Sequence, residues 1–495
     1  MTANATALAD LLAFQKETEA LGQIAGRLGW DQETMMPRGA ADQRGEEMAA
    51  IESVLHARRT DPRIGDWLAA TEGTEMSQAE TAKLRHIRRS FDRACKVPAE
   101  LAAELARVTS VSQGHWAEAR ANDDFAAFAP VLSRVVELRQ QEGQALAEGG
   151  SVYDALLGDY EPGATADQLE AMFGEMRPRL VELRGKVLDK PAPKGLSGTF
   201  GEAEQIAMAG KLAVTFGYDL SRGRIDKAVH PFSSGSGSDV RITTRTAPED
   251  PFNCFYSTIH EVGHACYEQN IDAGYALTPL GQGVSMGVHE SQSRIYENQL
   301  GRSRAFTSWL YAQMTETFGD LGLDGPEAFY AAVNRVQKDY IRTEADELQY
   351  NLHIMLRFDL ERALIAGDLP VAELETAWKE RFEKDFGYPV PKASYGCLQD
   401  VHWSIGLFGY FPTYSLGNVY AGCLAQALRA DVPDLDASLA QGNTAPATQW
   451  LAEKVQRHGG LYEPRDVITQ ACGAAPTAGA LLAYIEEKFS DLYDL

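Results

Sequence analysis

The sequence predicts a mainly α-helical protein with one small β-sheet. Over most of the first 190 residues, and again through most of the chain after residue 303, apolar side chains recur every three or four positions. Such residues share one face of a helix, whereas alternate residues share one face of a strand. The alternating pattern of a strand is clearest at residues 239–245. We therefore predict a large helical fold with a short sheet.

The N-terminal part, about residues 1–190, is predicted to be helical throughout. Leu11, Phe14 and Leu21 keep a helical spacing, and Pro37 ends this first helix. Further helices are expected at residues 44–55, 78–95, 98–121 and 125–148.

A last N-terminal helix is expected to begin at a capping box. Thr165 and Gln168 have the required spacing, and the helix then runs to about Val187. Residues 190–195, Lys-Pro-Ala-Pro-Lys-Gly, are the clearest linker in the chain. They separate the helical N-terminal part from the remainder, about residues 200–495.

Composition limits the class of protein. The chain has 495 residues, of which 44% are hydrophobic, so it can bury a large core. Its formal net charge of −24 argues against binding to nucleic acid or to an anionic membrane. We find no run of about 18 apolar residues and no basic start of a signal peptide. The six cysteines are scattered without a C-x-x-C pair, which is typical of a cytoplasmic protein with reduced thiols.

The strand candidate lies between a flexible stretch and the central motif. Residues 233–238 alternate serine and glycine and are predicted to form a mobile loop. Residues 239–245 are rich in β-branched side chains and alternate like a strand. Such a strand could lie at a sheet edge and pair with an extended peptide, or it could be part of a purely structural sheet.

The chain is organised around a helix predicted at residues 251–270. Asp250 is a plausible N-cap, and Pro251 suits the first helical position. His260 and His264 are four residues apart, so both imidazoles can reach one metal ion from one helix face. Glu261 is rotated by about 100° from His260, where it can reach a water molecule without being a ligand. This is the H-E-x-x-H arrangement of zinc peptidases.

A third ligand is available 26 residues after His264. Glu290 would lie on a second helix that starts near Gly287 and runs through Leu300. Two histidines and one carboxylate leave a fourth position open for water, which is typical of catalytic rather than structural zinc. Glu268 is the rival third ligand, but it follows His264 by four positions and is expected to face away.

The metal-binding histidines also need partners for their second ring nitrogens. In many zinc peptidases that resemble this H-E-x-x-H pattern, an acidic residue follows the third ligand by four positions, but here that position is Arg294. Glu268 and Glu297 are the candidates for this role. Gly263, between the two histidines, costs about 1 kcal/mol in a helix interior, so another part of the backbone is expected to approach it closely.

The C-terminal part is again predicted to be helical except for one long segment. The helices are expected at residues 303–318, 325–365, 371–385, 415–430, 445–457 and 475–493. Residues 388–414 are instead rich in glycine, proline and aromatic side chains. His402, Tyr410 and Tyr414 in this segment could stabilise an oxyanion, or they could be packed core side chains. Asp400 is expected to orient His402 only weakly.

Arg342 allows two interpretations. It lies four residues before Asp346 in a stretch predicted to be helical, where the two would form an ion pair within one helix. Alternatively, its guanidinium could bind the carboxylate of a substrate through two parallel hydrogen bonds.

Together these motifs resemble the carboxypeptidase Taq family of metallocarboxypeptidases. The resemblance covers nearly the whole chain, and Trp30-Asp31-Gln32 and residues 408–414 extend it. Its motifs are His230-Pro231-Phe232, the strand with Asp239, Arg241 and Thr243, His260 to His264, His289 to Ser293, Ile341 to Asp346, and Gly396 to Trp403.

The resemblance implies a single catalytic domain over residues 1–495, with a mostly helical zincin fold. A small sheet would lie beside a long, deep active-site groove, and the helical part of about residues 1–190 would form one wall of it. Members of the family remove single residues from peptide C-termini, with broad side-chain tolerance and poor action at proline. They usually form homodimers and use zinc, and cobalt often supports activity as well.

The resemblance also assigns roles to residues. His260, His264 and Glu290 would hold the metal, and Glu261 would be the general base. Arg342 lies in the segment where the family has its carboxylate-binding arginine. His402 and Tyr410 or Tyr414 would stabilise the oxyanion. At one end of the groove, substrate length would be restricted by His230, Phe232, Asp239, Arg241 and Thr243.

Two other functions fit the same motifs. One is a metallo-oligopeptidase that cuts internal bonds, because such enzymes share the helical groove. The other is a non-catalytic protein that binds zinc or peptides, although such a protein would have no need of the base Glu261.

Overall fold

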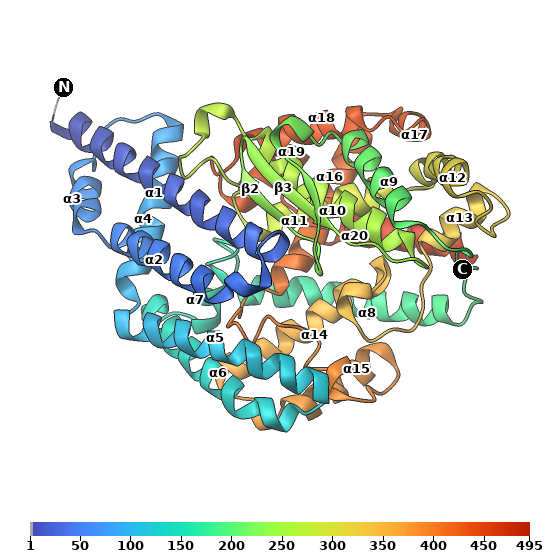
Figure 1. Ribbon diagram of the computed structural model, residues 1–495, viewed down its shortest axis with the longest axis horizontal. Coiled ribbons are helices and arrows are strands. Elements are labelled where there is room, and N and C mark those ends of the chain that lie inside the picture. The colour runs from blue at the N-terminus through green and yellow to red at the C-terminus, as the bar shows by residue number, and fades with distance from the viewer. Residues whose placement is uncertain (1–2) are drawn as a thin grey trace.

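A computed structural model describes residues 3–495 and confirms the mainly helical prediction (Figure 1). The first eight α-helices are α1 Ala3–Thr34, α2 Ala41–Arg59, α3 Pro62–Ala70, α4 Gln78–Lys96, α5 Ala99–Asn122, α6 Phe125–Ala147, α7 Val152–Leu157 and α8 Ala166–Leu188. The predicted capping residue is present, because the Thr165 hydroxyl accepts a hydrogen bond from the Gln168 amide at the start of α8. The sequence missed the short helices α3 and α7.

The remaining helices follow the linker. They are α9 Glu202–Thr215, α10 Pro251–Asn270, α11 Met286–Arg294, α12 Arg304–Phe318, α13 Pro326–Val333, α14 Glu347–Ala366, α15 Leu374–Phe386, α16 Pro412–Asp431, α17 Leu435–Leu439, α18 Ala445–Lys454, α19 Pro464–Cys472 and α20 Gly479–Tyr493. Helix α11 continues as a π-helix, η4 Ile295–Gly301. Helix α10 has the predicted bounds, with the Asp250 carboxylate accepting from the Phe252 amide. The sequence missed α9, α17 and α19.

The sheet corrects two predictions. Its strands are β1 Ile225–Lys227, β2 Ser233–Ser236 and β3 Asp239–Thr244, in the order β1-β3-β2. The strand predicted at residues 239–245 therefore exists, but it is central, so it has no free edge for a peptide. The predicted mobile loop is instead β2, which pairs antiparallel with β3. A two-residue turn joins them, and Gly237 supplies its positive φ of 63°.

The long helix predicted at residues 325–365 is wrong. Helix α13 ends at Val333, an extended segment follows, and Arg342–Glu344 form a single 3₁₀ turn, η5. Helix α14 begins only at Glu347, because the Asp346 side chain caps it by accepting from the Gln349 amide at 3.0 Å. Arg342 therefore lies outside any α-helix, and Asp346 is not its ion-pair partner.

Two glycines bring the helices of the central motif into close contact. A side-chain carbon at Gly263 of α10 would lie 2.6 Å from the carbonyl oxygen of Gln292 on α11. A side-chain carbon at Gly417 of α16 would lie 2.6 Å from the Cβ of Glu290. The expectation of a close backbone approach at Gly263 is thus confirmed. Helix α11 is held between α10 and α16, which fixes the position of Glu290.

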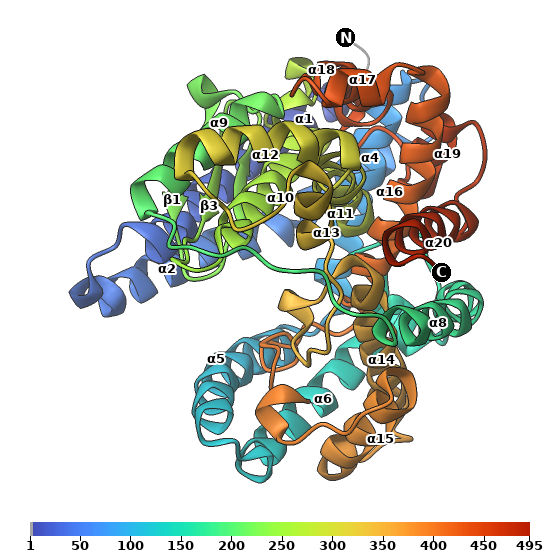
Figure 2. The ribbon, with the colours of Figure 1, turned by 90° about the vertical axis from the view of Figure 1, so that its right-hand side faces the viewer.

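A deep cavity separates two groups of elements. Helices α10, α11 and α12 lie in the upper half of Figure 2 with the sheet, and α5, α6, α14 and α15 lie in the lower half. Residues of both groups line a cavity of about 1230 Å³, including Trp116 of α5 and His260 of α10. Among the helices of residues 3–495, none is long and apolar enough to cross a membrane.

Candidate active site

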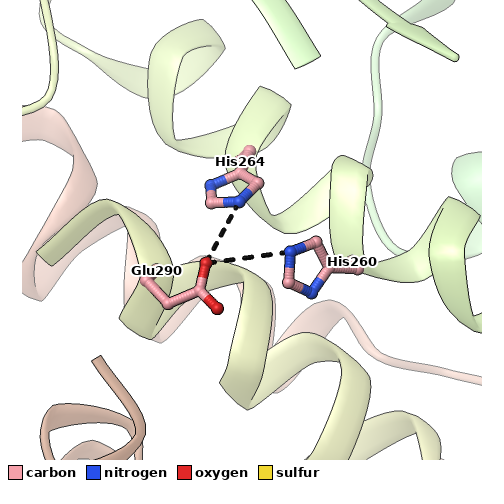
Figure 3. A group of neighbouring side chains, drawn as sticks. All are labelled: His260, His264 and Glu290. Carbon is pink, nitrogen blue, oxygen red and sulfur yellow. Dashed lines mark ion pairs between the residues drawn. The ribbon is translucent and has the colours of Figure 1, made fainter. Parts of the chain in front are cut away.

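Two histidines of α10 face a glutamate of α11 at the wall of this cavity (Figure 3). The Nε2 atoms of His260 and His264 lie 3.7 and 3.5 Å from Oε2 of Glu290. The three candidate ligand atoms all lie within 4.8 Å of one another. The three predicted metal ligands therefore lie together, two on α10 and one on α11.

These distances fit a tetrahedral divalent cation. Zinc binds imidazole nitrogen and carboxylate oxygen at about 2.0–2.2 Å, which places neighbouring ligands of a tetrahedron about 3.3–3.6 Å apart. The observed separations of 3.5 and 3.7 Å from Glu290 to the two histidines agree with this value. The three residues would therefore be able to hold a divalent metal, and all three line the cavity.

Each histidine has a partner at its other nitrogen. His260 Nδ1 lies 2.9 Å from Oε2 of Glu297, which is also paired with Arg294 and Arg302. Burial alone would raise the pKa of Glu297, but its bond to His260 and the two guanidinium groups outweigh burial and lower that pKa. Glu297, one of the two predicted candidates, is thus an ionised direct partner of a candidate ligand.

The second histidine is supported through a third ring. His264 Nδ1 lies 2.6 Å from Nδ1 of His289, and His289 Nε2 lies 2.9 Å from Oε1 of Glu268. Glu268, the other predicted candidate, therefore reaches His264 only through His289. The sequence placed His289 in a motif but gave it no contact, because its neighbour is 25 residues away on another helix.

Glu290 is held from behind by Arg294. Its Oε1 accepts a hydrogen bond from Arg294 Nε at 2.6 Å, which leaves Oε2 toward the histidines. Burial alone would raise the pKa of Glu290, but Arg294 and the two histidines lower it well below its usual range. The carboxylate is therefore ionised, as a metal ligand must be. Arg294, at the position where an acidic residue was sought, therefore orients the third candidate ligand.

Glu261 lies on the cavity wall beside this cluster. Only 6% of its surface is exposed, and burial raises its pKa to about 7. Among the described residues, none forms a hydrogen bond with its carboxylate, although the residue lines the cavity. A carboxylate with this pKa and without a competing partner suits the exchange of a proton near neutral pH.

His402 and two tyrosines form another part of the cavity wall. His402, Tyr410 and Tyr414 all line the cavity, and His402 Nε2 lies 3.3 Å from the Tyr414 hydroxyl. Burial and the nearby Arg342 lower the pKa of His402 to about 3, so the imidazole is neutral. These residues come from the segment 387–411 and the start of α16, as the irregular composition predicted.

Arg342 is buried in the same wall with partners that the sequence did not reveal. Its Nε donates to Oδ1 of Asp400 at 2.9 Å, and Nη1 donates to the Tyr350 hydroxyl at 3.2 Å. Oδ2 of Asp400 accepts in turn from Nε of Arg357 at 2.7 Å. Asp400 was expected to act weakly on His402, but it pairs mainly with the two arginines. Arg357 was missed altogether, because it looks like an ordinary position of a helix.

The residues predicted at the closed end of the groove divide between two cavities. His230 and Phe232 line the large cavity, and Thr243 bonds to the backbone amide of Phe232 at 2.9 Å. Asp239 and Arg241 pair with each other and line a second cavity of about 470 Å³, which lies against α1. The structure therefore brings His230 and Phe232 to the metal cluster's cavity but not Asp239 and Arg241.

Comparison with known proteins agrees with this geometry. The family described as Carboxypeptidase Taq (M32) metallopeptidase matches residues 10–489. Thermostable carboxypeptidase 1 of Thermus thermophilus is 40% identical over 502 residues, which cover 98% of each chain. Carboxypeptidase 1 of Bacillus subtilis is 34% identical over 488 residues, which cover 97% of each chain.

Solved structures show the same fold. The M32 carboxypeptidase of Deinococcus radiodurans matches with a TM-score of 0.96 at 39% identity, over 99% of this chain and all of that one. Metallocarboxypeptidase 1 of Trypanosoma cruzi matches with a TM-score of 0.95 at 32% identity, over 98% of this chain and 99% of that one. The family implies a divalent metal, for which the cluster of two histidines and a glutamate is the candidate site. The chain belongs to the carboxypeptidase Taq (M32) family of metallopeptidases and is a metallocarboxypeptidase.

Proposed function

We propose that this enzyme is a zinc-dependent carboxypeptidase that releases single amino acids from peptide C-termini, with broad specificity and poor action at proline. His260, His264 and Glu290 hold the zinc ion, and cobalt can substitute for it. The observation that carries the proposal is the separation of 3.5 and 3.7 Å between Glu290 and the two histidines, beside the Glu261 carboxylate, to which no described residue forms a hydrogen bond. The chemistry that zinc supplies when bound is polarisation of the scissile carbonyl and a lower pKa for water.

The protein's own residues perform the proton transfers and bind the substrate. Glu261 takes a proton from the attacking water and later delivers it to the leaving amine. Neutral His402 and a tyrosine, Tyr410 or Tyr414, donate hydrogen bonds to the oxyanion that develops on the carbonyl. Arg342 binds the terminal carboxylate through charge-assisted hydrogen bonds. Among the described residues, no partner uses its Nη2, and Arg342 lines the cavity.

The proposal extends to the end of the groove near the sheet. His230 and Phe232 restrict substrate length there, and Thr243 supports this position by its bond to the Phe232 backbone. Asp239 and Arg241 act from behind by fixing β3, since they pair with each other and Asp239 also pairs with Arg27. We propose that residues 1–495 act as one catalytic domain, because both the N-terminal helix α5 and the C-terminal part line the cavity.

We also propose that the enzyme works in the cytoplasm as a homodimer on peptide substrates. All six cysteines are free thiols in the structure, which suits a reducing compartment. The net charge of −24 favours solubility and disfavours nucleic acid as a partner.

Mass spectrometry of a peptide mixture tests the activity. We expect products that shorten one residue at a time from the C-terminus, with trimming slowed where proline is reached. Removal of metal with a chelator should stop the reaction, and zinc or cobalt should restore it. Internal cleavage of C-terminally amidated peptides at comparable rates would show an oligopeptidase instead.

The Glu290→Ala variant tests the third ligand. Because it leaves two histidines and solvent, we expect a large loss of zinc affinity, measured as bound metal per protein after dialysis against buffered zinc. Loss of a residue that only orients a metal ligand costs about 10–100-fold in metal affinity, so Glu268→Ala should lose less zinc affinity than Glu290→Ala. Metal retained by Glu290→Ala but lost by Glu268→Ala would contradict the assignment.

A further inference from the structure

Helix α14 carries a stripe of polar side chains that is fully buried. His353, Arg357 and Glu361 are spaced four apart, so they share one helix face, and none is more than 1% exposed. This face lies beneath the irregular segment 387–411. Glu361, for example, accepts from Trp403 Nε1 at 2.9 Å and from the Gly409 amide at 3.2 Å. The stripe therefore supports from below the segment that carries His402.

Arg357, in the middle of the stripe, shares a carboxylate with Arg342. Asp400 accepts from Arg342 Nε through Oδ1 at 2.9 Å and from Arg357 Nε through Oδ2 at 2.7 Å. Arg342 lines the large cavity, whereas Arg357 does not. Arg357 is 0% exposed and also donates to the carbonyl oxygen of His353 at 2.7 Å. The three side chains thus form a buried row, Arg357–Asp400–Arg342, in which Arg342 and Asp400 line the cavity and Arg357 lies behind them.

This row has an excess of positive charge. The two arginines and Asp400 sum to +1, because Asp400 is ionised: burial raises its pKa, but the two guanidinium groups lower it further. Among residues 3–495, no second carboxylate pairs with either arginine. The neighbouring His353 and His402 contribute no charge, since burial lowers the pKa of both, that of His402 to about 3.

A buried charge without a counter-ion is costly, and the cost is relieved when an anion binds. Asp400 alone would neutralise Arg342 and leave no electrostatic demand for a ligand. Arg357 prevents this because it forms an ion pair with the second oxygen of the same carboxylate. Glu361, one turn along α14, is another acid close enough to interact with Arg357, but burial raises its pKa to about 7, and its oxygens accept from Trp403, Tyr153 and the Gly409 amide rather than from Arg357. Of the two arginines only Arg342 lines the cavity, so the excess charge is available to a peptide's terminal carboxylate there.

We propose that Arg357 is a positioning residue for recognition of the terminal carboxylate: it holds Asp400 and keeps the buried row at a net charge of +1. The inference rests on the proposed role of Arg342 as the carboxylate anchor. Arg357 itself touches neither the substrate nor the candidate metal ligands, so its effect passes through Asp400.

A set of variants that changes only the charge of the row tests this inference. Arg357→Met lowers the sum to zero and leaves Asp400 to neutralise Arg342. We expect KM for free-acid peptides to rise by about tenfold or more, as for the loss of a buried charge contact, with a much smaller change in kcat. Amidated peptides should be little affected. The preference for free acid over amide therefore falls.

The double variant Arg357→Met/Asp400→Asn gives the sharpest comparison. It returns the sum to +1, and the asparagine oxygen can still accept from Arg342. We expect it to recover most of the free-acid preference that Arg357→Met loses. Arg357→Lys, which keeps the charge, should retain most of the preference. A double variant no better than Arg357→Met alone, or an equal rise in KM for amidated peptides, would show that Arg357 is only a packing residue.

Controls separate charge from folding and from the underlying role of Arg342. Arg184→Met is a matched control, because Arg184 is also a buried arginine against α14 but bonds to Gln349 rather than to Asp400. Its free-acid preference should be that of the wild type. Melting temperature and bound metal are measured for every variant. If Arg357→Met does not fold, Arg357→Gln takes its place, since it also lowers the sum to zero while keeping a donor.

The same assay distinguishes two failures. If Arg342→Ala keeps the wild-type preference for free acid, the proposed anchor is wrong and the role of Arg357 fails with it. If Arg342→Ala loses the preference but Arg357→Met keeps it, the anchor stands and only the present inference is overturned.

Discussion

Replacing Glu261 with glutamine is expected to abolish most peptide hydrolysis while leaving bound metal unchanged. The substitution removes the group that accepts the proton but spares His260, His264 and Glu290. Loss of a general base costs about 10²–10⁴-fold in rate. The amide is almost the same size as the carboxylate, so the buried site should keep its shape. The measurement is kcat with a free-acid peptide, together with bound zinc per protein.

A matched carboxylate gives the control for this variant. Glu249 is exposed at the mouth of the same cavity, so Glu249→Gln removes one acid there without touching the metal cluster. It should keep near-normal turnover. If Glu261→Gln also turned over at a near-normal rate with its metal in place, Glu261 would not be the base.

Replacing Arg342 with alanine is expected to remove most of the preference for a free terminal carboxylate. A desolvated charge pair of this kind contributes about 2–5 kcal/mol to transition-state binding, seen as a loss in kcat/KM. Arg342→Lys keeps the charge but loses the parallel hydrogen bonds, so it should be impaired to a lesser degree. Rates for a free-acid peptide and its amide are compared in the wild type and in each variant.

Arg245 supplies the control and the rival anchor. It lines the same cavity but is already paired with Glu344 at 3.1 Å and bonded to Asn253. Arg245→Ala should therefore keep the preference for free acid. If discrimination survived in Arg342→Ala and failed in Arg245→Ala, the anchor would be Arg245. Arg241, the other rival, is less suited because it is paired with Asp239 at the second cavity.

Much of the fold and the metal cluster could be predicted from local patterns. The N-cap at Asp250, the helix of residues 251–270 and the two histidines on its face depend on contacts within a few residues. Glu290 could be placed because its own helix begins where predicted, near Gly287. The close approach expected at Gly263 was also correct, since only a neighbouring backbone explains a glycine there.

The errors lie where distant parts of the chain decide the local structure. Residues 334–346 have the composition of a helix, yet their polar groups bond to the irregular segment, as when the Arg342 amide donates to Gln399 at 2.8 Å. Likewise, β3 is the central strand because β1 and β2 pair with its two edges, and no local pattern in β3 predicts those partners. The contact of Arg357 with Asp400 spans 43 residues, and no spacing rule predicts it.

The contact between the rings of His264 and His289 has a consequence for where protons sit. A carboxylate can only accept, so Glu268 requires the proton of a neutral His289 to be on Nε2. Nδ1 of His289 is then a bare lone pair, and the 2.6 Å contact requires His264 to carry its own proton on Nδ1. The lone pair of His264 Nε2 is thereby left facing Glu290. Glu268 thus selects the tautomer of His264 through an intervening ring. Glu268→Gln would no longer fix this tautomer, because an amide can present either a donor or an acceptor to His289.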